Sequence, residues 1–162
     1  MYNIILFFMK RFVPIVMFVL LSFIVGYVSM LLQQTALHVW YPSLVTSSLT
    51  PPGYVFSVVW GVLYLLMGIS AGIVWSTRTT FSWVLAVLFV VQLALNLLWS
   101  VCFFYLRSPI LGFAVLLLLF MVVLAYVGGC YKLNRLSAYL NVPYLLWLVF
   151  AGFLNCYIII FN

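Results

Sequence analysis

The sequence predicts an all-α integral membrane protein, a bundle of five transmembrane helices. Three observations lead to this fold class. Hydrophobic residue types make up 70% of the 162 residues and charged types only 4%, whereas average soluble domains are about 25% charged. The apolar residues form continuous runs that are close to the ~20 residues needed for a helix to cross a bilayer. A transmembrane β-barrel would instead show ~10-residue segments of alternating hydrophobicity.

Five apolar runs are expected to form the helices, and residues 1–162 to form a single domain. The predicted spans are residues 12–32, 54–75, 81–106, 110–131 and 137–161. The first run follows the basic pair Lys10-Arg11, and the second follows Pro51-Pro52-Gly53. Short polar or basic turns at residues 76–80, 107–109 and 132–135 precede the other three. Met9-Lys10-Arg11 resembles a natural start, so translation from Met9 rather than Met1 is an open alternative.

The link between the first two spans, residues 33–53, is longer than the other connections. It contains Trp40-Tyr41-Pro42 and then a polar Ser/Thr run. Long loops in compact proteins are often functional lids. The alternative is a surface crossover between two distant helices, and the sequence leaves both interpretations open.

The absence of acidic residues excludes much chemistry. The chain has six Lys or Arg residues, no Asp or Glu, and one histidine, His38. Paired-carboxylate catalysis and Ser-His-Asp triads are therefore impossible, and no histidine-based metal site is predicted. Six cations spread over the whole chain form no basic stripe, so we predict no nucleic-acid partner. The expected surroundings are a lipid bilayer.

The positions of the cations predict an orientation. Lys10, Arg11, Arg78, Lys132 and Arg135 fall on one side of a five-span topology, and only Arg107 falls on the other. The positive-inside rule places the N-terminus and these five cations in the cytoplasm. This prediction assumes a bacterial plasma membrane. The mitochondrial outer membrane is the alternative location.

Polar and aromatic side chains recur at helical spacing within three of the spans. Gln92, Asn96, Trp99 and Phe103 share one face of the third span,. Similar faces are formed in the second span by Phe56, Trp60 and Tyr64, and in the fifth by Trp147, Ala151 and Asn155. An amide pair above flat rings suits a ligand that carries hydrogen-bond acceptors and rings. The alternatives are polar contacts between helices and ordinary aromatic packing.

Gly68 and Gly72 form a G-x-x-x-G pattern in the second span. Small residues at this spacing allow two helix backbones to approach closely. The pattern is compatible with a contact inside the chain or with a dimer interface.

Several motifs, in order, resemble the tryptophan-rich sensory protein / translocator protein (TspO/MBR) family. They cover about residues 40–162. The matching segments are Trp40-Tyr41-Pro42, Pro51-Pro52-Gly53-Tyr54, Gln92-Leu93-Ala94-Leu95-Asn96-Leu97-Leu98-Trp99, Pro143-Tyr144-Leu145-Leu146-Trp147 and Leu154-Asn155.

The resemblance implies a ligand pocket open toward the long first loop, and commonly a homodimer. Family ligands are porphyrins and haem-like tetrapyrroles, drug-like isoquinolines and benzodiazepines, and cholesterol in animals. No obligatory cofactor is implied. By motif position, Trp60 and Asn96 would be the polar contacts of the pocket, and Tyr41 and Pro52 would contribute from the loop. Trp99, Trp147, Ala151 and Asn155 would line the remaining wall.

We therefore expect a membrane receptor or regulator that binds porphyrins. Arg107 is a candidate partner for a ligand carboxylate. Two alternatives are a tetrapyrrole transporter and a light-dependent porphyrin-degrading enzyme, for which Trp60 and Trp147 would be the reactive residues. No other catalytic residues are predicted.

The chain departs from the family pattern at three places. Thr46-Ser47 stand where the family often has Lys-Pro. Val115 stands near a position where the family often has an acid. The basic residue of the animal cholesterol motif is also missing after the fifth span.

Overall fold

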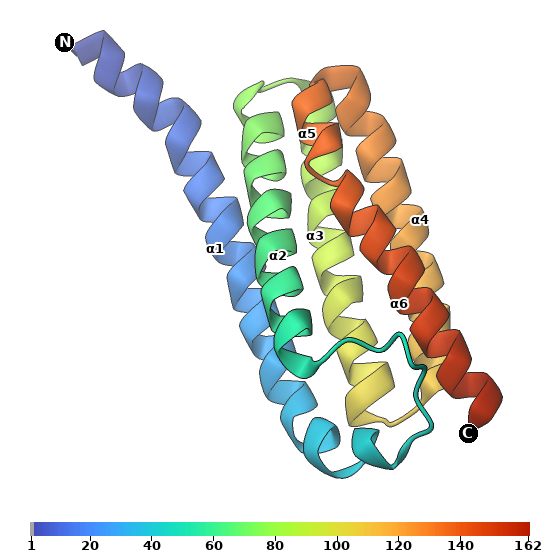
Figure 1. Ribbon diagram of the computed structural model, residues 1–162. Coiled ribbons are helices and arrows are strands. Elements are labelled where there is room, and N and C mark those ends of the chain that lie inside the picture. The colour runs from blue at the N-terminus through green and yellow to red at the C-terminus, as the bar shows by residue number, and fades with distance from the viewer. Residues whose placement is uncertain (1) are drawn as a thin grey trace.

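The computed structural model of the protein describes residues 2–162, and the side chains from Phe12 onward; all of its regular elements in this part are helical. Met1 lies outside the described residues, so the choice between Met1 and Met9 as the start stays a prediction. Five long helices of the described chain form a bundle, whose arrangement is shown in Figure 1. They are α1 (Tyr2–Val39), α2 (Gly53–Ser76), α3 (Thr80–Ser100), α4 (Pro109–Leu133) and α6 (Val142–Phe161). Three short elements interrupt or join them: the 3₁₀ turn η1 (Tyr41–Ser43), the π-helical turn η2 (Val101–Tyr105) and α5 (Arg135–Tyr139).

The predicted fold class is confirmed. Five stretches of the described chain are long and apolar enough to cross a membrane: Phe12–Val39, Gly53–Ser76, Thr80–Tyr105, Pro109–Leu133 and Arg135–Phe161. Every backbone polar group inside hydrocarbon must be paired, and helices achieve this within one segment. Their hydropathy and length therefore fix the element type, whereas their boundaries depend on local contacts.

The first helix is longer than predicted. We expected it to end at Leu32 and the link to begin at residue 33, but α1 continues to Val39. Gln33, Gln34 and His38 are polar without being helix breakers, because Gln has a good intrinsic helix propensity. The 28 residues of Phe12–Val39 extend about 42 Å at 1.5 Å per residue, which exceeds the ~30 Å hydrocarbon core. The first loop therefore comprises residues 40–52.

The third span does not remain α-helical to its end. It changes at Ser100 into the π-helical turn η2, in which Leu106 N–H donates to Val101 O (2.8 Å). This turn buries the three consecutive side chains of Cys102, Phe103 and Phe104, which an α-helix lying on one face of a bundle would not do. Wide turns of this kind are frequent at functional sites.

The fifth span is broken between α5 and α6, so the prediction of one helix over residues 137–161 is wrong in this respect. Pro143 lies in the first turn of α6 and has no N–H with which to continue the preceding helix,. Buried polar groups satisfy the broken backbone. The Asn141 amide donates to Ser137 O (2.8 Å) and to Ser70 Oγ (2.7 Å), and Ser70 Oγ donates to Ser137 O (2.9 Å).

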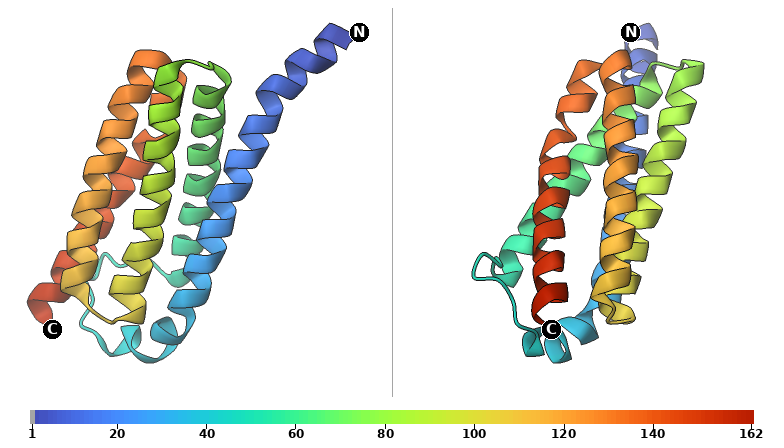
Figure 2. Two further views of the ribbon diagram at one scale, coloured as in Figure 1. Left: turned by 180° about the vertical axis from the view of Figure 1, so that it is seen from behind. Right: turned by 90° about the vertical axis from the view of Figure 1, so that its right-hand side faces the viewer.

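Helices α1 and α2 lie side by side and are held together by two glycines. A Cβ atom on Gly68 would collide with the backbone of Val19, and one on Gly72 with the backbone of Ile15. The G-x-x-x-G pattern therefore serves a contact inside the chain. Figures 1 and 2 show that the N-terminal end of α1 then diverges from the bundle.

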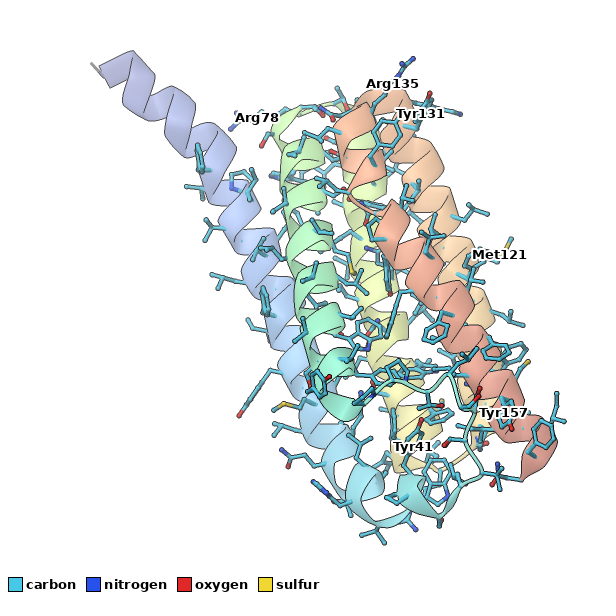
Figure 3. All side chains as sticks on the ribbon, viewed as in Figure 1. Tyr41, Arg78, Met121, Tyr131, Arg135 and Tyr157 are labelled. Atoms are coloured by element: carbon cyan, nitrogen blue, oxygen red, sulfur yellow. The ribbon has the colours of Figure 1, made fainter. Side chains whose placement is uncertain are left out.

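The two ends of the bundle differ in character. Figure 3 shows Arg78 and Arg135 at one end, and Tyr41 and Tyr157 at the opposite end. Arg135 lies over the Tyr131 ring, 5.2 Å from its centroid. The first loop is at the end that holds Tyr41, near the C-terminal end of α6 (Figure 1). Arg78 and Arg135 therefore lie at the same end of the bundle, as the five-span topology predicts.

Candidate ligand-binding site

A small cavity lies between α2, α3, α4 and α6. Its walls are Trp60, Asn96, Trp99, Leu116, Leu119, Leu148 and Ala151. Four of these residues, Trp60, Asn96, Trp99 and Ala151, are in the predicted site. The free volume of about 10 Å³ is just enough for one water molecule, so a larger ligand requires the walls to move.

Asn96 is held by two tyrosines on neighbouring helices. The Tyr64 hydroxyl donates to Asn96 Oδ1 at 2.9 Å, and Asn96 Nδ2 donates to the Tyr144 hydroxyl at 3.1 Å. All three side chains are buried. The hydrogen bonds join α3 to α2 and α6, which is the helix-joining role left open by the sequence. An amide has two N–H donors and two lone pairs, so Asn96 also keeps one donor for a ligand.

Aromatic rings surround Trp60. The ring of Tyr64 stacks on it with a centroid distance of 5.4 Å and an interplanar angle of 29°. Trp147 stands edge-on to Trp60, with centroids 6.4 Å apart. Phe56 in turn lies edge-on to Trp147, at 5.5 Å. The structure thus brings Phe56, Trp60, Tyr64 and Trp147 together in one cluster beside the cavity.

A second aromatic cluster connects the cavity to the first loop. Trp99 stacks on Phe103 (5.4 Å, 20°) and meets Phe104 edge-on (5.6 Å). From the loop side, Trp40 packs on Phe103 (5.7 Å) and Tyr41 on Phe104 (6.0 Å). The ring of Phe104 thus lies between Tyr41 and Trp99 of the cavity wall. Burial raises the pKa of the Tyr41 phenol above its usual value, because the charged form loses solvation,.

Eight of the twelve predicted site residues do not line this cavity. Five of them belong to the two aromatic clusters, and the other three, Gln92, Asn155 and Pro52, belong to neither. Gln92 is fully buried, and neither of its amide atoms has a partner in the described part of the chain. Asn155 pairs with the first turn of α4: in the amide orientation that satisfies both atoms, it donates to Pro109 O (2.9 Å) and accepts from Phe113 N–H (3.2 Å). Pro52 caps the N-terminus of α2.

Two buried indole groups are unpaired. The N–H groups of Trp99 and Trp147 find no acceptor among the residues that the structure describes. An unpaired buried donor costs free energy, on the order of 1–3 kcal/mol. An acceptor on a bound molecule or a water would recover it. Within residues 2–162 no three His or Cys side chains gather into a possible metal site.

The sequence-based site omitted Leu116 and Leu119 of α4, and Tyr144 and Leu148 of α6. Nothing in α4 would have pointed to its two leucines, because the helix is apolar all round. Tyr144 precedes Ala151 by seven residues and so shares its face. That spacing could have identified it.

These features define a class of protein: an integral membrane bundle of five helices that encloses an aromatic-walled cavity. The model of the TspO/MBR family matches residues 18–161, and the chain belongs to this family. The predicted resemblance is therefore confirmed.

The chain is similar to relatives from bacteria and mammals. It is 35% identical to the tryptophan-rich protein TspO of Chlorobaculum tepidum over 129 residues, which cover 76% of this chain and 79% of the relative. It is 40% identical to protein CrtK of Rhodobacter capsulatus over 120 residues, 72% and 74% of the two chains. It is 34% identical to the translocator protein of Bos taurus over 146 residues, 88% and 86% of the two chains.

Proposed function

We propose that the protein is a membrane receptor or regulator that binds porphyrins and related flat hydrophobic molecules between its helices. The observation that carries this proposal is the cavity beside Trp60 and Trp99, with the buried N–H groups of Trp99 and Trp147 left unpaired. A flat ring system with oxygen acceptors would stack on the indoles and pair with their donors. Each aromatic contact contributes on the order of 0.5–1.5 kcal/mol beyond area burial.

The charge of the chain favours an anionic ligand. Six cations and no Asp or Glu give a formal charge of +6, so no acidic side chain of the protein would repel the carboxylates of a porphyrin. Arg107 lies in the turn after η2, at the same end as the first loop, and is exposed. It would be available to a ligand carboxylate at the mouth of the site.

Binding requires the cavity to expand, since ligand pockets usually enclose about 300–1,000 Å³. The walls formed by Leu116, Leu119 and Leu148 are suited to this movement, because displacing an apolar side chain breaks no hydrogen bond. Asn96 is more constrained by Tyr64 and Tyr144. We therefore expect the ligand to enter between the leucines and the indoles, with Asn96 offering its remaining N–H.

The composition favours binding over proton-coupled transport. Carriers of that type use ionisable residues inside the membrane. Here the sequence has no acid, and its one histidine, His38, lies in the last turn of α1. The residues within the bundle can hold a ligand, but they provide no evident group for taking up and releasing protons.

The test is a titration of the purified protein with protoporphyrin IX, followed by the absorbance of the porphyrin. We expect saturable binding, weakened about two- to tenfold by Trp60→Phe, because phenylalanine lacks the indole N–H donor and offers a smaller ring for stacking. Asn96→Ala should also weaken binding. The matched control is Trp83→Phe: Trp83 is 63% exposed and packs on Trp75 beside the α2–α3 turn, so its replacement should leave the Kd unchanged.

Two outcomes would refute the proposal in different ways. Absence of saturable binding in the unmodified protein would refute the porphyrin as ligand. Saturable binding with the same Kd in the unmodified, Trp60→Phe and Asn96→Ala proteins would show that the porphyrin binds elsewhere on the molecule.

A further inference from the structure

The side chain of Asn162, which follows α6, is paired with the backbone of the first loop. Val45 N–H donates to Asn162 Oδ1 at 2.9 Å, and Asn162 Nδ2 donates back to Val45 O at 3.2 Å. The same amide nitrogen also donates to Ile158 O at 3.0 Å, which fixes it against the last turn of α6. The Asn162 amide thus pairs with both the N–H and the C=O of Val45, as a residue of a neighbouring β-strand would.

These contacts are different from the other hydrogen bonds of the loop. Within the described part of the chain, the remaining ones are local. They join residues at most four positions apart, such as Leu44 N–H to Tyr41 O, Leu49 N–H to Ser47 Oγ and Thr50 N–H to Ser47 O. Among the described residues, only the Asn162 amide joins the loop by hydrogen bonds to a helix other than α1 and α2, the two helices that the loop connects. Figure 1 shows the corresponding course of the chain, from the end of α1 to the end of α6 and back to α2.

Apolar contacts connect this loop to the cavity. Trp40 and Tyr41 pack on Phe103 and Phe104, and both of these rings pack on Trp99 in the cavity wall. Release of the loop would uncover the rings next to Trp99. The position of the loop thereby affects access to the site from this end of the bundle.

We propose that Asn162 is a positioning residue that latches the first loop closed over the mouth of the site and so sets the rate at which ligands enter and leave. The consequence for ligands rests on the proposed function, whereas the latch itself can be tested without a ligand. Two neutral, solvent-exposed hydrogen bonds are strong enough to favour the closed loop by about tenfold and weak enough to break often.

The first experiment measures the latch directly. The Val45 amide is bonded to Asn162 and is otherwise at the surface, so its hydrogen exchange reports opening of this contact. We expect Asn162→Ala to accelerate exchange at Val45 about tenfold. The matched control is Ser43→Ala, which removes an exposed hydrogen bond inside the loop itself, from Ser43 Oγ to Trp40 O (2.7 Å), and should leave exchange at Val45 unchanged.

The second experiment measures the effect on protoporphyrin IX. Opening of the loop precedes both entry and exit, so Asn162→Ala should raise the association and dissociation rates together, by up to about tenfold, with little change in Kd. A residue that merely lines the pocket would change the Kd, mainly through dissociation.

A reversible cross-link supplies the opposite perturbation. Val45→Cys and Asn162→Cys are introduced together with Cys156→Ser, because Cys156 is the one native thiol that is not buried. A short reducible bis-maleimide should join the two new thiols, slow association of the porphyrin at least tenfold, and lose this effect when the linker is reduced.

The outcomes separate the latch from the function. Equal exchange at Val45 in Asn162→Ala and the unmodified protein would overturn the latch. Faster exchange with unchanged porphyrin rates would overturn its control of access. Faster exchange in a protein that shows no saturable porphyrin binding would support the latch and refute the proposed ligand.

Discussion

Asn96 shows how one residue can serve both the fold and a site. Its side chain is 1% exposed, and its two polar atoms are bonded to Tyr64 and Tyr144 from two other helices. An unpaired amide in hydrocarbon is costly, so the tyrosines make the presence of Asn96 in the bundle tolerable. They also fix the direction of the N–H that remains for a ligand. Helix joining and ligand contact, which the sequence presents as alternatives, are compatible at this position.

The contribution of this network can be tested at Tyr64. Tyr64→Phe keeps the ring that stacks on Trp60 but leaves Asn96 Oδ1 without its donor. We expect a loss of stability of about 1 kcal/mol, since hydrogen bonds between membrane helices are usually worth ~0.6 kcal/mol and an orphaned buried acceptor adds to the cost. Thermal unfolding in detergent micelles measures it.

Tyr54→Phe is the control in the same helix. Tyr54 is 72% exposed, so its variant should unfold at the same temperature as the unmodified protein. An equal effect of the two substitutions would contradict the role assigned to the Tyr64–Asn96 bond. In a double-mutant cycle, Tyr64→Phe should lower the free energy of unfolding by a smaller amount when Asn96→Ala is already present.

At the scale of the helix, the pairing of α1 with α2 depends on two positions that lack side chains. Gly68 and Gly72 admit the backbone of α1 at Val19 and Ile15. In a membrane, lipid is as apolar as leucine, so close backbone approach is a main source of helix association. These glycines hold α1 against the bundle up to the point where its N-terminal end diverges.

Alanine substitution distinguishes this contact from a general effect on α2. Gly68→Ala and Gly72→Ala should each destabilise the protein by about 1–3 kcal/mol, the usual cost of overpacking. Gly61→Ala should be neutral or stabilising by up to about 1 kcal/mol, because nothing lies within 4 Å of its added Cβ and alanine is the better helix former.

Thermal unfolding of the three variants measures the order of their stabilities. Light scattering of the protein in micelles measures the oligomeric state of each variant. If Gly68→Ala changed the oligomeric state without lowering the unfolding temperature, the glycines would belong to an interface between copies. The internal contact would then not be their main role.

The helices were predictable because hydropathy and length alone determine them, whereas their interruptions depend on tertiary contacts as well as on local sequence. Pro143 accounts for the place of the break before α6,. The hydroxyl of Ser70 in α2, which donates to Ser137 O and accepts from the Asn141 amide, is a partner from another helix. No local pattern reveals such a partner. The extension of α1 to Val39 has a simpler explanation, since Gln33 is polar and so indicates the end of an apolar run, but glutamine does not end a helix,.

The candidate site was predictable to the extent that polar and aromatic residues stand out in an apolar chain. Spacing identified the faces that carry Trp60, Asn96 and Ala151, which meet at the cavity. It could not identify Leu116 or Leu119, since the positions around them in α4 are apolar on all sides of the helix. Nor could it show that Asn155 pairs with the backbone of α4, because spacing within one helix does not indicate which neighbour that helix touches.

On the scale of the whole molecule, charge distinguishes the two ends of the bundle. Arg78 and Arg135 lie at the end opposite Tyr41 and the first loop (Figure 3), and Lys132 is in the last turn of α4, which immediately precedes Arg135. Arg107 is at the loop end. With no acid in the sequence, none of these cations can be neutralised by an acidic side chain of the same chain. The positive-inside rule therefore predicts a cytoplasmic position for the Arg78 end and an external position for the first loop.

Labelling of single cysteines tests this orientation in a bacterial host. In a background with Cys156→Ser, Ser48→Cys places an exposed thiol in the first loop and Thr80→Cys places one beside Arg78. We expect a membrane-impermeant maleimide to label Ser48→Cys in intact spheroplasts and to label Thr80→Cys only after the membrane is opened. The background protein, in which Cys102 and Cys130 are buried, controls for labelling of native thiols. The reverse pattern would place the first loop in the cytoplasm and the Arg78 end outside, and would contradict the predicted orientation.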